Sequence, residues 1–186
     1  MDVIEAIFTR QSVGKVKPDP VPAEVIERLL LAAVQAPNHY KVRPWRFVVL
    51  TGPGRERLGQ VMADSFRAKF PQAPPEALEK ERNKALRSPV LVVVGVDKPA
   101  EPRVVEIENI CAAAAACQNL LLAAHAEGLA AKWRTGSPAT DPAVKQFLGF
   151  EPDQNLIAFI YIGYPEGEAP PVERPSFDDR TVWIAE

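Results

Sequence analysis

The sequence predicts an α+β protein in which helices pack over a central sheet around one buried helix. Residues 90–96 and 156–162 are continuous apolar runs of strand length, which is typical of strands buried on both faces. Between these runs, residues 104–126 place apolar side chains at three- and four-residue steps and fill the other faces largely with alanine. This pattern predicts a helix that is buried nearly all round and that neighbouring elements approach closely.

Two amphipathic helices open the chain. Asp2 can cap a helix that ends near Arg10. Pro22 suits the first turn of a second helix, which Pro37 terminates. The first helix gathers its large apolar side chains on one face: Val3, Ile4, Ile7 and Phe8. We therefore expect each of these helices to bury one face.

A polar loop, a strand and two surface helices follow. Residues 37–44 are dense in hydrogen-bond donors, and residues 45–50 predict a strand. Residues 51–54 indicate a turn, followed by helices over residues 55–69 and 74–86. Both helices carry charges of alternating sign, which is typical of a solvated face.

The last third of the chain continues from the predicted buried helix. A glycine at position 128 suits the end of that helix, and residues 129–136 predict a short strand. Residues 141–148 predict a short helix that begins at Asp-Pro, before the strand at 156–162. Residues 181–184 resemble one more strand, with no partner left in the chain's own core. A partner subunit is the simplest destination for this tail.

Composition limits the class of protein. The length of 186 residues and the hydrophobic content of 47% fit one domain over residues 1–186. The net charge of −2 indicates no electrostatic surface for nucleic acid. We find no basic leader and no apolar run as long as a membrane span. Cys111 and Cys117 lie six residues apart on the predicted helix and point in different directions, so they are no redox pair. We expect a cytoplasmic protein without a membrane partner.

The sequence contains none of the usual catalytic motifs in complete form. Gly52-Pro53-Gly54 follows a predicted strand but lacks the third glycine of a dinucleotide fingerprint. Two histidines and scattered acids offer neither a metal-ligand cluster nor a Ser-His-Asp arrangement. His125 on the central helix fits a core or interface histidine. We therefore predict no catalytic side chain and no metal site.

Short polar clusters stand at the ends of the apolar elements, and together they carry a resemblance. They are Arg-Gln-Ser-Val-Gly at 10–14, Ala-Pro-Asn-His-Tyr-Lys-Val-Arg-Pro-Trp-Arg-Phe-Val-Val at 36–49, Ala-Lys-Trp-Arg-Thr-Gly at 131–136 and Tyr-Ile-Gly-Tyr-Pro at 161–165. In this order, over essentially the whole chain, they resemble the nitroreductase family of flavoproteins. Within the family the chain is most similar to the minimal bacterial branch, the YdjA-like nitroreductases.

The resemblance implies a fold and an activity. The fold would be nitroreductase-like, with a mostly antiparallel sheet flanked by helices and a C-terminal tail that extends to the partner subunit. The protein would be an obligate homodimer that binds two FMN molecules at its interface. Hydride would pass from NADH or NADPH to FMN and then to a nitroaromatic, a quinone or a similar acceptor, by a ping-pong mechanism. Because the flavin carries the electrons, no side-chain nucleophile is required.

The resemblance also assigns cofactor-binding residues. The cluster that would hold the FMN phosphate and ribityl chain comprises Arg10, Gln11 and Ser12. The loop that would reach the flavin of the other subunit contributes Gln35, Pro37, Asn38 and His39. The segment that would lie along the isoalloxazine and phosphate comprises Trp133, Arg134 and Thr135, and Arg174 in the tail would contact phosphate. Guanidinium groups and hydroxyl donors suit a phosphate of charge near −2.

The chain departs from the family pattern at one position, and two alternative functions remain open. Many family members have glutamine before Pro-Trp where this chain has Arg43, which places an extra positive charge near the cofactor loop and bears on substrate choice. The same fold could perform reductive dehalogenation or flavin fragmentation. A flavin-binding protein without turnover is the alternative from another class, and NAD(P)H oxidation with an added acceptor separates it from an enzyme.

Overall fold

A computed structural model describes residues 1–185, and Glu186, the last residue of the predicted domain, lies outside the described residues. The strands are β1 (Trp45–Thr51), β2 (Val90–Val96), β3 (Ala130–Arg134) and β4 (Asn155–Gly163). The α-helices are α1 (Val3–Thr9), α2 (Ala23–Ala33), α3 (Gly52–Lys69), α4 (Pro75–Arg82), α5 (Glu106–Ala126) and α6 (Pro142–Phe147). Short 3₁₀ turns are η1 (His39–Lys41), η2 (Asn83–Leu86), η3 (Ser137–Thr140) and η4 (Asp178–Arg180).

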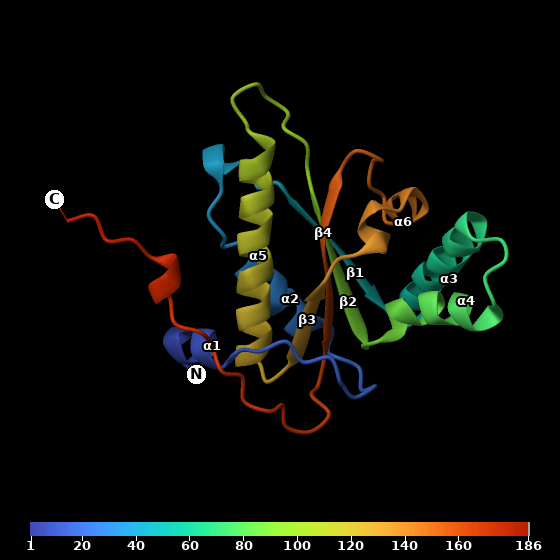
Figure 1. The fold of residues 1–186 in the computed structure, drawn as a ribbon, viewed down its shortest axis with the longest axis horizontal. Coiled ribbons are helices and arrows are strands. Elements are labelled where there is room, and N and C mark those ends of the chain that lie inside the picture. Colours follow the sequence, from blue (N-terminus) through green and yellow to red (C-terminus); the bar gives the residue numbers. More distant parts are fainter. Residues whose placement is uncertain (186) are drawn as a thin grey trace.

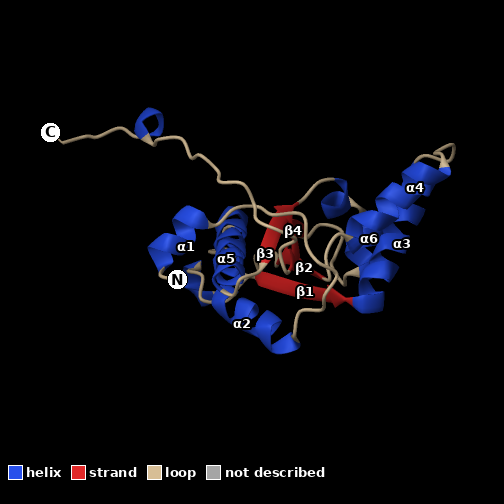
Figure 2. Cartoon of the chain, turned by 90° about the horizontal axis from the view of Figure 1, so that it is seen from below, coloured by secondary structure: helices blue, strands red, loops and turns tan. Residues whose placement is uncertain are grey.

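The four strands found in residues 1–185 form one sheet in the order β1-β2-β4-β3, and every neighbouring pair is antiparallel. Helices α2 and α5 cover one face, and α3 and α6 cover the other, with α4 packed on α3 (Figure 2). Every residue of β2 is buried, because its alternate side chains enter the cores of both layers. The predicted α+β class, with helices over a central sheet, is confirmed.

Helix α5 runs alongside the sheet (Figure 1). Ala113, Ala116 and Leu120 are fully buried against α2 and the sheet. Ile107, however, is 60% exposed, and Cys111 is also exposed. The expectation that α5 is buried nearly all round is therefore wrong for one chain, because α2 and the sheet cover only part of its circumference.

By length and composition alone, α5 would suffice to cross a membrane. The expectation that no apolar run reaches that length is therefore wrong. The alanine and leucine side chains on one side of α5 pack in the core between α2 and the sheet, and this packing accounts for the apolar character of the buried side.

Two further apolar surfaces are uncovered. Asp2 caps α1 as predicted, its carboxylate accepting from the amide of Glu5. Yet the apolar face of α1 is exposed, with Phe8 at 73%. The predicted strand at 181–184 is not a strand in the described chain, and Trp183 is 83% exposed on a tail that extends away from the other elements (Figure 1).

Two predicted boundaries are wrong. The predicted turn at 51–54 is the first turn of α3, since Pro53 at this position loses no helical hydrogen bond. The predicted helix over 74–86 divides into α4 and η2 at Asn83. The backbone at this point packs so closely on α3 that only glycine fits at position 59: a Cβ atom at Gly59 would lie 2.4 Å from the carbonyl oxygen of Arg82.

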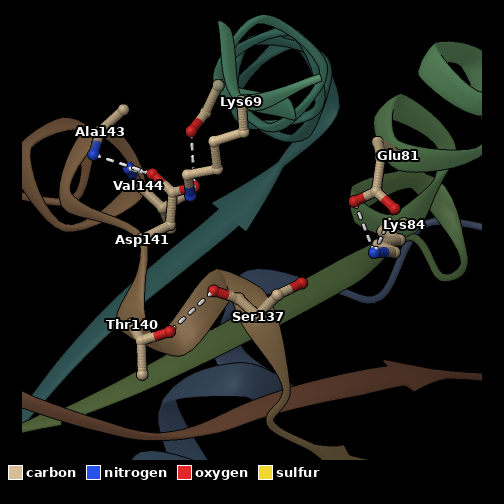
Figure 3. A network of polar contacts seen from close by, with 9 residues as sticks. Lys69, Glu81, Lys84, Ser137, Thr140, Asp141, Ala143 and Val144 are labelled. Carbon is tan, nitrogen blue, oxygen red and sulfur yellow. Dashed lines mark hydrogen bonds and ion pairs between the residues drawn. The ribbon is translucent and has the colours of Figure 1, made fainter. Parts of the chain in front are cut away.

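A buried carboxylate ties α6 to α3. Asp141 caps α6 by accepting from the amides of Ala143 and Val144, and it accepts from Lys69 Nζ of α3 at 2.6 Å (Figure 3). The hydroxyl of Ser65 also donates to this carboxylate. Burial alone would raise the pKa of Asp141, but the hydrogen bonds from Lys69, Ser65 and the backbone outweigh it and lower the pKa.

We expect Asp141→Asn to reduce the free energy of unfolding by about 1–3 kcal/mol at pH 7, because the charged bond to Lys69 is lost while the amide oxygen still caps α6. A pKa lowered by folding stabilises the protein above the unfolded value of about 4. This stabilisation disappears as the pH falls through the folded pKa. Urea unfolding at neutral and acidic pH measures the difference. The exposed Asp64→Asn on α3 is the control, and a difference between Asp141→Asn and the wild type that is the same at every pH would contradict the prediction.

Candidate functional site

The segment that follows α1 lies beside β3. Helix α1 ends at Thr9, and Ser12 forms a parallel bridge with Ala131. The amide of Val13 donates to the carbonyl of Ala131 at 3.2 Å. The fold thus brings two of the predicted polar clusters together, although about 120 residues separate them in the sequence.

Arg10 and Arg174 form a pair of cations at the end of α1. Nη2 of Arg174 donates to the carbonyl oxygen of Arg10 at 2.8 Å. Partial burial and the neighbouring charge of Arg174 lower the pKa of Arg10. Within residues 1–185, neither guanidinium forms an ion pair with an acid. Two cations held together without a counter-ion are suited to an anionic ligand.

Two adjoining pockets open at this pair. One of about 270 Å³ lies between the end of α1 and the tail and includes Arg10, Gln11 and Arg174. The other, of about 500 Å³, also includes Arg10 and Gln11 and reaches Leu121, Leu129 and Ala131. The pair of pockets therefore offers cations at one end and an apolar wall at the other, as a ligand with a charged group and a flat apolar body requires.

His125 lies at the edge of the larger pocket. Its Nε2 is 2.8 Å from the hydroxyl oxygen of Thr9. This contact joins the end of α1 to α5, so the histidine is satisfied within the fold, as the sequence indicates.

Residues 133–135 divide between two faces of the sheet. The indole Nε1 of Trp133 donates to the carbonyl of Ile157 at 2.9 Å, and the ring packs on the core beneath α5. Arg134 and Thr135 line a separate pocket that also includes Arg87 and Tyr161. The structure thus groups Arg134 with Arg87 and not with Arg10.

The loop after α2 docks at the other end of α5. Asn38 accepts from the amide of Arg43 at 2.8 Å, and Nδ1 of His39 lies 3.0 Å from a carboxylate oxygen of Glu108. Tyr40, Lys41 and Arg43 have positive φ angles, which L-residues seldom adopt outside functional or tightly held loops. Pro37, Asn38 and His39 line a pocket of about 450 Å³ against α5. Gln35 donates to the carbonyl of Leu31 and does not line that pocket.

The predicted residues therefore form three groups: the end of α1 with Arg174, the pair Arg134 and Thr135, and the loop after α2. The first and the last of these groups lie far apart in one chain. Contacts fix His39 at Glu108 and the end of α1 at His125, seventeen residues apart along α5. At about 1.5 Å per residue this separation is roughly 25 Å. One chain cannot place both groups on the same flavin ring.

Sequence reasoning missed Arg87, Lys84 and the pocket they share with Arg134. Arg87 follows η2 and Tyr161 lies on β4, so no spacing within one element links them. Tyr161 belongs to the Tyr-Ile-Gly-Tyr-Pro motif at 161–165, but no residue near it in the sequence indicates its cationic neighbours.

Comparison with known proteins decides the family. The family model described as "Nitroreductase family" matches residues 7–164. The chain belongs to the nitroreductase family. This membership confirms the resemblance and accounts for the shared order of polar clusters along the chain.

Individual relatives agree with this assignment. YdjA of Escherichia coli K12, provisionally named an NAD(P)H nitroreductase, is 28% identical over 169 residues, or 91% of each chain. A nitroreductase-like family protein of Bacillus cereus has a structure with a TM-score of 0.83 and 25% identity, covering 99% of this chain and 96% of that one. A Desulfovibrio desulfuricans protein, provisionally named a nitroreductase and solved with FMN, gives a TM-score of 0.74 at 25% identity, with 94% and 92% covered. The nitroreductase-like fold is thus confirmed.

Proposed function

We propose that this protein is an FMN-dependent oxidoreductase that transfers hydride from NADH or NADPH to a nitroaromatic, a quinone or a similar acceptor. The observation that carries the proposal is the Arg10–Arg174 pair, which has no acidic partner in the described chain and lies next to the bridge between Ser12 and Ala131. Family membership supports it, since a relative of this fold binds FMN and another is named for NAD(P)H.

The residues present fit FMN. Arg10 and Arg174 supply guanidinium forks for a doubly charged phosphate, and Gln11, which lines both pockets, supplies a further donor. We propose that the hydroxyl of Ser12, at the bridge to Ala131, also reaches the cofactor. Leu129 and Ala131 contribute an apolar wall in the adjoining pocket. When bound, FMN would supply the redox chemistry by accepting and then donating hydride in a ping-pong cycle. The chain's own residues bind and orient the cofactor and its substrates, and none is proposed to be catalytic.

We propose that residues 1–186 form one domain and that the site is completed by a second copy of the chain. The roughly 25 Å that separates the two groups along α5 supports this. In a homodimer, the partner's loop would bring Gln35, Pro37, Asn38 and His39 to the flavin held by Arg10 and Arg174. The uncovered apolar side chains of α1, α5 and the tail would become buried in an obligate interface, of a class that exceeds about 2,000 Å².

Steady-state oxidation of NAD(P)H by the FMN-loaded protein tests the function. We expect turnover with a nitroaromatic or a quinone, and parallel double-reciprocal plots when reductant and acceptor are varied together. Intersecting plots would contradict a ping-pong mechanism. Flavin binding without turnover would favour a binding protein, and product analysis would detect dehalogenation or flavin fragmentation. A cytoplasmic location, small-molecule substrates and no nucleic-acid partner complete the proposal.

A further inference from the structure

The loop after α2 follows a backbone path that its own residues do not favour. Tyr40, Lys41 and Arg43 have φ angles between 51° and 57°, in the left-handed region that side chains with a Cβ atom seldom adopt. Glycine, the residue that usually supplies such angles, is absent from residues 37–44. A loop of this kind persists only where surrounding contacts fix its path.

Two contacts tie the loop to the beginning of α5. The turn η1, which contains His39 and Tyr40, lies beside the first residues of that helix (Figure 1). Nδ1 of His39 is 3.0 Å from a carboxylate oxygen of Glu108. The guanidinium of Arg103, in the segment that leads into α5, lies over the ring of Tyr40 at 4.8 Å from its centre, where the aromatic face attracts a cation. Both residues are therefore held by α5 and the segment before it.

The first turns of α5 are themselves fixed to the sheet. Nδ2 of Asn109, which is buried, donates to the carbonyl oxygen of Asp97, just after β2, at 3.2 Å. Glu106 accepts from Nδ2 of Asn155, at the start of β4, at 2.7 Å. These two bonds flank Glu108 in the sequence. The sheet thus fixes the helix at this point, and the carboxylate of Glu108 fixes the loop.

The contact also decides which nitrogen of the His39 ring carries a proton. An ionised carboxylate can only accept, so Nδ1 is the donor, and Nε2 is left free to meet a ligand. His125 has the opposite arrangement. The hydroxyl of Thr9 donates its one hydrogen to the carbonyl of Glu5 at 2.6 Å, so Nε2 of His125 donates to Thr9. The two histidines of the chain are therefore expected in different tautomers.

We propose that Glu108 is a positioning residue: it holds His39, and through His39 the loop at 37–44, in the conformation that meets the flavin of the partner subunit. The inference rests on the proposed function, which places His39 at that flavin, and it adds a residue outside the cofactor-binding set. Glu108 acts through the ring and not on the cofactor. Without its carboxylate, part of the free energy of FMN binding would be used to order the loop, and the affinity would fall.

Titration of the FMN-free protein with FMN tests whether Glu108 acts through His39. The variants are Glu108→Ala, Glu108→Gln, His39→Ala and the double variant with alanine at both positions, which together form a double-mutant cycle. Glu106→Gln is the matched control. It removes an acid from the same part of α5, and its amide oxygen can still accept from Asn155.

We expect Glu108→Ala to weaken FMN binding about tenfold, which is within the usual range for two residues in contact. Glu108→Gln should have an intermediate effect, because its amide oxygen can still accept from Nδ1. In the His39→Ala background, the change at Glu108 should have no further effect, and Glu106→Gln should bind FMN like the wild type. Equal losses with and without His39, or an unchanged affinity in Glu108→Ala, would overturn the proposal.

Nuclear magnetic resonance of the histidine rings gives a readout that needs neither FMN nor turnover. Long-range correlations between ring nitrogens and carbon-bound protons identify the protonated nitrogen, at about pH 8, where an ordinary histidine is neutral. We expect His39 to carry a proton on Nδ1 in the wild type and to lose this preference in Glu108→Ala. His125 should stay protonated at Nε2 in both proteins. A wild-type His39 without a proton on Nδ1 would contradict the proposed contact.

The same titration separates this inference from the proposed function. If the wild type did not bind FMN, the proposed function would be wrong, and the role of Glu108 would fall with it. If FMN bound and His39→Ala weakened its binding while Glu108→Ala did not, the positioning role alone would be wrong.

Discussion

Replacing Arg10 with alanine is expected to weaken FMN binding by tenfold or more while leaving turnover at saturating FMN close to that of the wild type. A charge-assisted hydrogen bond contributes roughly 1.5–3 kcal/mol, and the phosphate lies far from the reacting end of the flavin. The substitution keeps the Arg10 carbonyl that accepts from Arg174, so the tail contact should persist. Titration of the FMN-free protein, followed by flavin fluorescence, measures the affinity.

Matched variants make this result specific. Arg10→Lys keeps the charge without the planar fork and should have intermediate affinity. Arg174→Ala should also weaken binding, because it removes the second cation of the pair. Arg57→Ala, on the exposed surface of α3, should have no effect. An unchanged affinity in Arg10→Ala would mean that the first polar cluster does not hold the phosphate.

Ending the chain after Arg174 is expected to loosen the dimer and to lower flavin occupancy at the same time. The truncation keeps Arg174 but removes the exposed apolar side chains of the tail: Phe177, Val182, Trp183 and Ile184. These side chains are 63–88% exposed in one chain. Covering them with a partner subunit stabilises the dimer by about 25 cal/mol for every Å² of apolar surface buried. Sedimentation velocity and the ratio of FMN to protein measure both effects.

Trp183→Ala is the milder counterpart of the truncation. It should shift the same two quantities in the same direction by a smaller amount, and FMN should raise the melting temperature of each variant by mass action. If the truncated chain were a flavin-loaded monomer of about 20 kDa, or an unaltered dimer, the role proposed for the tail would be wrong.

The elements of the fold were predictable because their signals are local. The apolar runs at 90–96 and 156–162 form β2 and β4, Asp2 caps α1 as predicted, and α6 begins at the predicted Asp-Pro step. Burial of a whole helix was not predictable in the same way. What covers Ile107 or Phe8 depends on neighbouring elements, and in one chain neither is covered.

The candidate site was predictable only in part. The resemblance linked Arg10 to Arg174, which are 164 residues apart, and the structure brings them together. It could not show that Arg134 would join Arg87, because that grouping depends on the side of β3 from which Arg134 projects. It could also not reveal the distance along α5 between the two groups of residues, which is set by packing and not by sequence spacing.

The identity of the bound cofactor tests the central claim most directly. We predict that the purified protein is yellow and that denaturation releases FMN and not FAD, because the cation pair suits one terminal phosphate and no dinucleotide fingerprint is present in the sequence. A colourless protein that produces no change in flavin absorbance when titrated with FMN would contradict the account.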